Sequence, residues 1–184
     1  MIRLISGGSA SGKSEYAEGL ICSIRDESAE PVRLVYLATM RSDCLEAVAR
    51  IERHRHLRVG KGFFTIEYSE GFDEVLSGID ENTAVLLEDL PNMLSCNMYT
   101  AGGETDDKAP ERVLDEIVQI AKSCETLVIV TDDIFSDGNV YEESVELYRK
   151  ALASLNIELA MMAGGVTEVV AGIPIEHKHD TTGL

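Results

Sequence analysis

A glycine-rich motif near the N-terminus constrains the fold of this chain more than any other feature. Residues 7–14 read Gly-Gly-Ser-Ala-Ser-Gly-Lys-Ser, which matches the pattern GxxxxGK[ST] at every fixed position. The motif follows a short apolar run, 1–6, and opens a segment with helical spacing, 13–24. A glycine turn between a buried strand and a helix directs backbone N–H groups and the positive helix end toward an anion. The sequence therefore predicts a loop that binds nucleotide phosphates.

Each part of this loop has its own predicted contact with a nucleoside triphosphate such as ATP or GTP. The side chain of Lys13 is expected to place its charge on the β- and γ-phosphates. The hydroxyl of Ser14 is expected to bind Mg²⁺. The whole set of predicted nucleotide-binding residues in the loop is Gly7, Gly8, Ser9, Ala10, Ser11, Gly12, Lys13 and Ser14.

A metal bound at such a loop usually has an acidic partner at the end of a neighbouring buried strand. Two apolar runs of this chain end in acidic pairs. Glu88 and Asp89 follow the run 83–87 and are the first candidates; Asp132 and Asp133 follow the run 126–130 and are the second. A strand-end acid that simply faces solvent is the alternative for each of them. We favour Glu88 as the residue near the metal and the nucleotide.

The distribution of apolar residues along the whole chain indicates a single α/β domain over 1–184. The strands that it predicts are 1–6, 33–38, 63–68, 83–87, 126–130 and 166–171. They lack polar alternation and are separated by helical segments, which is typical of a mainly parallel sheet covered by helices on both faces. We also predict an amphipathic helix over 43–57, a mobile loop over 100–108 and a loosely held polar tail over 173–184.

Charge and cysteine content limit the partners and the compartment. With 33 acidic and 16 basic residues the net charge is −17, which disfavours binding to nucleic acid or an anionic membrane. No apolar run approaches the roughly 18 residues that a membrane span needs. Cysteines 22, 44, 96 and 124 are widely spaced, with no metal-ligand pattern. We therefore expect reduced thiols and a cytoplasmic protein.

A basic segment interrupts the acidic sequence at 50–58. Its arginines are Arg50, Arg53, Arg55 and Arg58, and they flank His54 and His56. Guanidinium groups match phosphate geometry, and imidazole can attack phosphorus to form a covalent intermediate. The segment has two possible interpretations. One of its histidines accepts a nucleotidyl group, or the histidines are ordinary polar residues at the surface. Chemistry alone does not choose between the two histidines.

At this point the chain resembles the bifunctional adenosylcobinamide kinase / adenosylcobinamide-phosphate guanylyltransferase family of cobalamin biosynthesis. The family patterns GGxxSGKS, YIAT, RIxxHRxxR, TxE, LLxD/E and VTNE all have counterparts here in the same order. The matching segments are Gly7–Ser14, Tyr36–Thr39, Arg50–Arg58, Thr65–Glu67, Leu86–Glu88 and Val130–Asp133. A last family stretch, VNxxLA followed by VxxVVxGI, is similar to Asn156, Leu159, Ala160 and residues 166–173. The resemblance therefore spans nearly the whole chain, and RIxxHR makes it far more specific than the phosphate loop alone.

The resemblance implies a P-loop NTPase (RecA-like) fold and two reactions. A nucleoside triphosphate phosphorylates adenosylcobinamide, and GMP from GTP then passes through a guanylyl-histidine to adenosylcobinamide phosphate. By position the guanylylated residue is His54, in the HR of RIxxHR. The other residues to which the resemblance gives a catalytic or nucleotide-binding role are Lys13, Arg50, Arg55, Arg58, Glu67 and Glu88, with Ser14 and Glu88 near Mg²⁺. A homo-oligomer, such as a trimer, is also implied.

Two departures from the family pattern affect the choice of substrate. Asp132 and Asp133 replace the Asn and Glu of the family's VTNE, and the acidic stretch Glu142–Glu146 replaces a segment with two arginines. Two alternatives therefore remain open. One is a P-loop kinase of another small alcohol, and the other is a nucleotide-binding regulatory protein that has lost catalysis.

Overall fold

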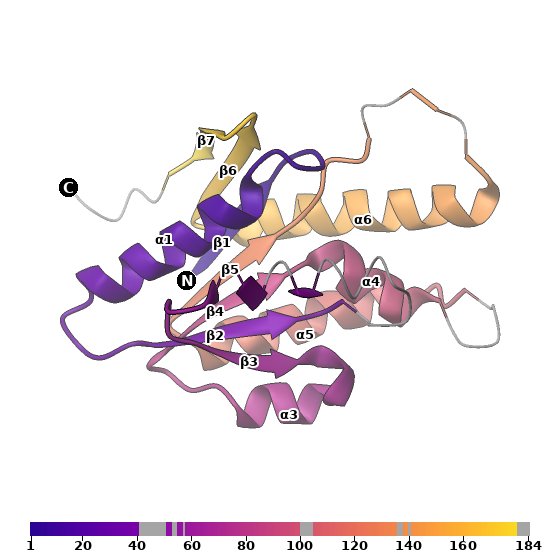
Figure 1. Ribbon diagram of the computed structural model, residues 1–184. Coiled ribbons are helices and arrows are strands. Elements are labelled where there is room, and N and C mark those ends of the chain that lie inside the picture. Colours follow the sequence, from indigo (N-terminus) through magenta and orange to yellow (C-terminus); the bar gives the residue numbers. More distant parts are fainter. Residues whose placement is uncertain are drawn as a thin grey trace.

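The computed structural model describes residues 1–40, 51–52, 55–56, 58–99, 105–135, 138–139 and 141–179. Its strands form one sheet in the order β3-β2-β4-β5-β1-β6-β7 (Figure 1). The strands are β1 (Ile2–Ser6), β2 (Arg33–Ala38), β3 (Phe63–Glu67), β4 (Thr83–Glu88), β5 (Thr126–Val130), β6 (Gly165–Val170) and β7 (Ile173–Lys178). All neighbouring strands are parallel except β6 and β7. The predicted mainly parallel sheet is thus confirmed.

Helices cover both faces of this sheet (Figure 1). The helices are α1 (Lys13–Glu27), α3 (Phe72–Ser77), α4 (Leu90–Met98), α5 (Ala109–Ser123) and α6 (Glu143–Met162), with the 3₁₀ turn η1 (Tyr68–Glu70). One buried cluster joins α1 to alternate residues of the strands, and a second joins the other residues to α3, α4, α5 and α6. Because each central strand is buried on two faces, its sequence is continuously apolar.

The central strands bring their carboxyl ends to the same edge of the sheet, where the loops after them meet. The register pairs Ile5 of β1 with Val130 of β5, and Ala38 of β2 with Glu88 of β4. The phosphate loop after β1 therefore lies beside the residues that follow β4 and β5. In an open α/β sheet this is the edge at which ligands bind.

The C-terminal part of the chain differs from the prediction. We expected a loosely held tail over 173–184, but Ile173–Lys178 forms β7, which pairs antiparallel with β6. All six of its residues are exposed, so the burial pattern that marks the other strands is missing from its sequence. The turn between the two strands also touches the phosphate loop, since the N–H of Gly172 donates to the carbonyl oxygen of Ser11 at 2.7 Å.

Two other predicted segments fall partly outside the described residues. Of the helix expected over 43–57, residues 51, 52, 55 and 56 are helical, and 43–50, 53, 54 and 57 lie outside the described residues. Of the loop expected over 100–108, the structure describes 105–108, where Thr105 forms an isolated bridge with Tyr99. Within the described chain, none of the helices combines the length and apolar character that crossing a bilayer would require.

Candidate functional site

The phosphate loop connects β1 to α1 in the way that the sequence predicts. Gly12 stands at the N-cap of α1 with φ of 94°, a left-handed backbone that glycine adopts without a steric penalty. Gly7 is required for a different reason, because a Cβ atom there would lie 2.6 Å from the carbonyl oxygen of Val169. The loop is thus held between α1 and the neighbouring strand β6.

We expect Gly7→Ala to destabilise the nucleotide-free protein by about 1–3 kcal/mol, the usual cost of overpacking. The added methyl group would meet backbone of β6, which cannot turn away as a side chain can. Gly8→Ala is the matched control, since no atom of the described residues lies within 4 Å of a Cβ built at Gly8. Urea unfolding followed by circular dichroism measures both. Equal stability of the two variants would contradict the predicted contact with β6.

The amino group of Lys13 lies inside the loop. It donates to the carbonyl oxygen of Gly8 at 3.1 Å and forms an ion pair with Asp132, Nζ to Oδ1 2.7 Å. The Lys13 side chain is only 11% exposed, so its charge is held in place by these contacts. Asp132 follows β5, and it is one of the second pair of strand-end acids proposed from the sequence.

Ser14 contacts Glu88, the acid that we favoured from the sequence. The Ser14 hydroxyl donates to Oε1 of Glu88 at 2.6 Å. The second carboxyl oxygen, Oε2, is buried and has no hydrogen-bond partner among the residues that the structure describes. Burial raises the pKa of Glu88 to about 8, and the charge of Asp89 adds to this effect. The Ser14 hydrogen bond and the charge of Lys13 oppose it.

The raised pKa of Glu88 predicts a pH-dependent effect of Glu88→Gln on stability. The pKa of Glu88 is an ordinary 4.5 in the unfolded chain and about 8 in the folded protein. The protonated carboxyl group therefore makes its full contribution to stability below pH 4.5. This contribution is lost as the pH rises through the interval between the two pKa values, because only the unfolded chain ionises freely there. Each pH unit is worth about 1.4 kcal/mol, so we expect the variant to gain roughly 2–4 kcal/mol relative to wild type between pH 5 and 8.5.

Urea titrations of both proteins at several pH values, without metal or nucleotide, measure this gain. Glutamine also changes the hydrogen bonding of the site, but that contribution is the same at every pH. The test therefore depends on how the difference in unfolding free energy between Glu88→Gln and wild type changes with pH. A difference that does not change with pH would contradict the raised pKa of Glu88.

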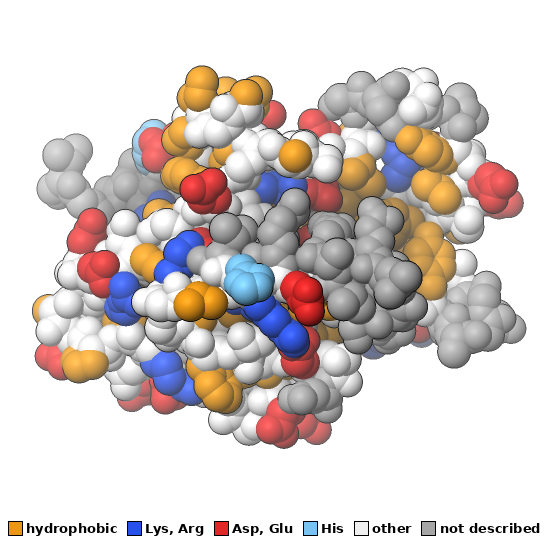
Figure 2. Space-filling view, viewed as in Figure 1, with side chains coloured by type: hydrophobic (Ala, Val, Ile, Leu, Met, Phe, Trp, Pro, Cys, Tyr) orange, Lys and Arg blue, Asp and Glu red, His pale blue; other side chains and the backbone are white. Residues whose placement is uncertain are grey.

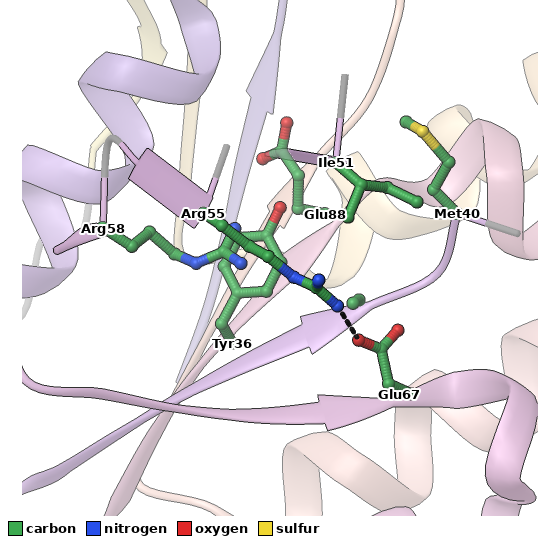
Figure 3. Close-up of a pocket in the computed structure, with 8 residues that line it drawn as sticks. Tyr36, Met40, Ile51, Arg55, Arg58, Glu67 and Glu88 are labelled. Carbon is green, nitrogen blue, oxygen red and sulfur yellow. Dashed lines mark hydrogen bonds and ion pairs between the residues drawn. The ribbon is translucent and has the colours of Figure 1, made fainter. Parts of the chain in front are cut away.

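A second group of predicted residues lines a pocket next to Glu88 (Figure 3). The guanidinium of Arg58 stacks on the ring of Tyr36, 3.3 Å from its centroid, and its Nη1 atom is buried without a hydrogen-bond partner among the described residues. Arg55 reaches across the pocket to Glu67, Nη2 to Oε1 3.5 Å. The residues that line this pocket are Tyr36, Ala38, Met40, Ile51, Arg55, Arg58, Glu67 and Glu88.

The structure thus brings together the phosphate loop, Glu88 and three residues that the resemblance singled out: Arg55, Arg58 and Glu67. The remaining two predicted site residues, Arg50 and His54, lie outside the described residues. No group of three or more His, Cys, Asp or Glu side chains suited to a metal ion occurs in the described ranges. Beside the phosphate loop, the Ser14 hydroxyl and the Glu88 carboxylate bring together oxygen atoms of the kind that Mg²⁺ prefers as ligands.

Sequence reasoning missed several contacts of the site. It offered Asp132 only as an alternative to Glu88, whereas the two acids bond to adjacent residues of the loop, Lys13 and Ser14. It assigned no role to Tyr36 beyond its place in the YIAT-like segment. The signal for Asp132 was its position two residues after the end of the buried strand β5, which the sequence does show.

Comparison with protein families matches residues 3–177 to the family described as "CobU: Cobinamide kinase / cobinamide phosphate guanyltransferase". Two curated relatives carry the description "Bifunctional adenosylcobalamin biosynthesis protein CobU". The protein from Escherichia coli K12 is 31% identical, and the one from Salmonella typhimurium LT2 is 29% identical. Each alignment covers 97% of this chain and 100% of the relative.

Among solved structures, the chain is similar to an ATPase domain with a TM-score of 0.57 and 9% sequence identity. The alignment covers 98% of this chain and 77% of that chain. At such low identity the likeness concerns the fold alone. Together with the sheet and the phosphate loop, it shows an α/β P-loop NTPase fold.

Proposed function

The chain belongs to the cobinamide kinase / cobinamide phosphate guanyltransferase family, and from this premise we propose that it performs both reactions in its family's name. It phosphorylates the side-chain hydroxyl of adenosylcobinamide with a nucleoside triphosphate. It then transfers GMP from GTP to adenosylcobinamide phosphate, which gives GDP-cobinamide. The observation that supports the proposal is the arrangement at the phosphate loop, where Lys13 contacts the carbonyl oxygen of Gly8 and Ser14 contacts Glu88.

The kinase step is supported by the chemistry of the loop. Lys13 can exchange its contact with Asp132 for the β- and γ-phosphates, because both partners are anionic oxygens. Ser14 and Glu88 offer the hard oxygen ligands that Mg²⁺ prefers, and the buried Oε2 of Glu88 lacks a partner among the described residues. These two residues would hold the ion, which supplies positive charge that stabilises the phosphates when bound. In phosphoryl transfer most of the catalysis comes from such positioning and charge.

The guanylyl step is assigned to the basic segment. An imidazole nitrogen of His54 attacks the α-phosphorus of GTP, and pyrophosphate leaves with the electrons of the broken bond. A phosphate oxygen of adenosylcobinamide phosphate then attacks the same phosphorus and frees the histidine. Arg55 and Arg58, on the same segment as His54, would offset the negative charge of the phosphates. Their position beside Glu88 supports a shared site for the two steps.

We also propose that the chain forms a homo-oligomer. Several large apolar side chains are exposed on the β6–β7 hairpin and on α6, and Figure 2 shows hydrophobic side chains over that hairpin. Ile173 is 65% exposed and Met161 is 71% exposed. Light scattering on the purified protein measures its molar mass in solution. A molar mass equal to that of one chain at micromolar concentration would contradict this proposal.

Product analysis tests the proposed function directly. The protein is incubated with adenosylcobinamide and Mg²⁺, with ATP or GTP, and the corrinoids are separated and weighed by mass spectrometry. We expect adenosylcobinamide phosphate with a suitable nucleoside triphosphate and GDP-cobinamide when GTP is present. A protein that binds nucleotide yet leaves adenosylcobinamide unchanged would instead be a kinase of another alcohol or a regulatory protein.

A further inference from the structure

A hollow of about 630 Å³ opens beside the phosphate loop. None of the described residues that line it also lines the pocket that contains Arg55 and Arg58. Its walls come from the loop itself, from the segment after β5 and from the first turns of α6. Figure 2 shows hydrophobic side chains gathered over the beginning of α6, at the right of the view. Ligand pockets in proteins commonly enclose roughly 300–1,000 Å³, so this hollow has room for a sizeable organic group.

The floor of the hollow is part of the phosphate-binding machinery. Gly8 lines the hollow, and its carbonyl oxygen accepts a hydrogen bond from Lys13. The opposite lip is fixed to the same loop, because the N–H of Asp133 donates to the carbonyl oxygen of Gly7 at 3.1 Å. A molecule in the hollow would therefore touch the loop on which the terminal phosphate of a nucleotide rests.

The upper walls are apolar and aromatic. Ile134 and Val145 line the hollow together with Tyr141 and Tyr148. The Tyr148 hydroxyl donates to the carbonyl oxygen of Pro91 at 3.1 Å, which fixes this ring against α4. Such walls bind the apolar body of a ligand, and the tyrosine rings can also accept a cation.

The charged side chains of the hollow do not favour a free anion. Arg149 lines it, but its guanidinium is already paired with Glu146 at 2.8 Å and lies 5.0 Å from the Tyr141 ring centroid. Its Nη2 atom also donates to the carbonyl oxygen of Phe135 at 3.4 Å. Asp133 contributes a carboxylate at the lip. The hollow therefore suits a neutral or cationic ligand with a large apolar part.

We propose that this hollow holds the acceptor alcohol of the kinase step, which rests on the proposed function. The apolar body of the acceptor lies against Val145 and Tyr148, and its hydroxyl reaches toward the terminal phosphate past Gly8. The hydroxyl oxygen then forms a bond to the γ-phosphorus while the bond to the β–γ bridging oxygen breaks. The nucleoside diphosphate leaves with that electron pair, and the hydroxyl proton passes to water. The hollow, rather than the phosphate loop, selects the acceptor.

Val145→Asp tests this assignment, because covering a new carboxylate in the apolar wall with the apolar body of the acceptor would cost desolvation free energy. Val145 is 37% exposed near the start of α6, where an acidic residue is compatible with the helix. Leu147→Asp is the matched control, since Leu147 is 40% exposed on the same helix and does not line the hollow. Val145→Trp fills the hollow without adding charge. Equilibrium dialysis with adenosylcobinamide and a non-hydrolysable nucleotide measures acceptor binding, and initial rates give KM for each substrate.

We expect both changes at Val145 to weaken adenosylcobinamide binding and to raise its KM by about tenfold or more, with nucleotide affinity within about twofold of wild type. Leu147→Asp should behave as wild type. If the wild type phosphorylates adenosylcobinamide and the Val145 variants bind it normally, the hollow is not the acceptor site, while the proposed function stands. If the wild type binds nucleotide but neither binds nor phosphorylates adenosylcobinamide, the proposed function fails and this assignment fails with it.

Discussion

Lys13→Met is expected to lower the rate of adenosylcobinamide phosphorylation roughly a thousandfold, the scale seen when one preorganised charge or donor is removed from a transition state. Methionine keeps most of the length and apolar stem of lysine but removes its charge. The variant also leaves Asp132 without its 2.7 Å ion pair, next to the position that the nucleotide phosphates are expected to take. Both effects oppose the accumulation of negative charge during transfer.

Steady-state kinetics with saturating nucleotide measure this loss in kcat. Lys150→Met is the matched control, since Lys150 is exposed on α6 and far along the sequence from the loop. Thermal unfolding of both variants establishes that they remain folded. A Lys13→Met protein that retained more than about a tenth of the wild-type kcat would contradict the role given to this lysine.

His54→Ala is expected to abolish the formation of GDP-cobinamide and to leave the phosphorylation of adenosylcobinamide within about threefold of wild type. The reason is chemical, because alanine has no atom that can attack phosphorus, whereas the kinase step needs no covalent intermediate. His56→Ala is the control for general disturbance of the segment. It should retain both activities, since His56 is an exposed helical residue.

Separate assays of the two steps, with adenosylcobinamide and with adenosylcobinamide phosphate as acceptors, measure this split. Equal loss of both activities in a folded His54→Ala protein would contradict the proposal that His54 acts in guanylyl transfer and not in phosphorylation. If His56→Ala loses guanylyl transfer and His54→Ala does not, the nucleophile is His56.

The sequence predicted the central sheet and the phosphate loop because their signals are local. A strand buried on two faces must be apolar at successive positions, as Thr126–Val130 is, and the loop has fixed residues at fixed spacing. The edge strand β7 has neither signal. Its exposed positions, from Ile173 to Lys178, read as a tail, and only its pairing with β6 gives it structure.

The helix α4 was not predicted either, although its sequence contains a start signal. Asp89 caps it by accepting a hydrogen bond from the N–H of Asn92 at 2.8 Å, and Pro91 stands in its first turn. An acidic cap followed by proline is a recognised helix start. The sequence presents Asp89 as a candidate acidic partner of the metal, whereas in the structure its side chain caps α4.

The contacts of the candidate site depend on pairs of residues that the sequence separates widely. Ser14 and Glu88 are 74 positions apart, and spacing along the chain cannot reveal their 2.6 Å hydrogen bond. The hollow beside Gly8 was not predicted, because its walls come from three segments that only the fold brings together.

Intact-protein mass spectrometry after incubation with Mg²⁺ and GTP tests the central claim most directly. The account predicts an acid-labile adduct with the mass of a GMP group on the wild type and on His56→Ala, and none on His54→Ala. The absence of an adduct from a folded wild-type protein that binds GTP would contradict a guanylyl-histidine mechanism.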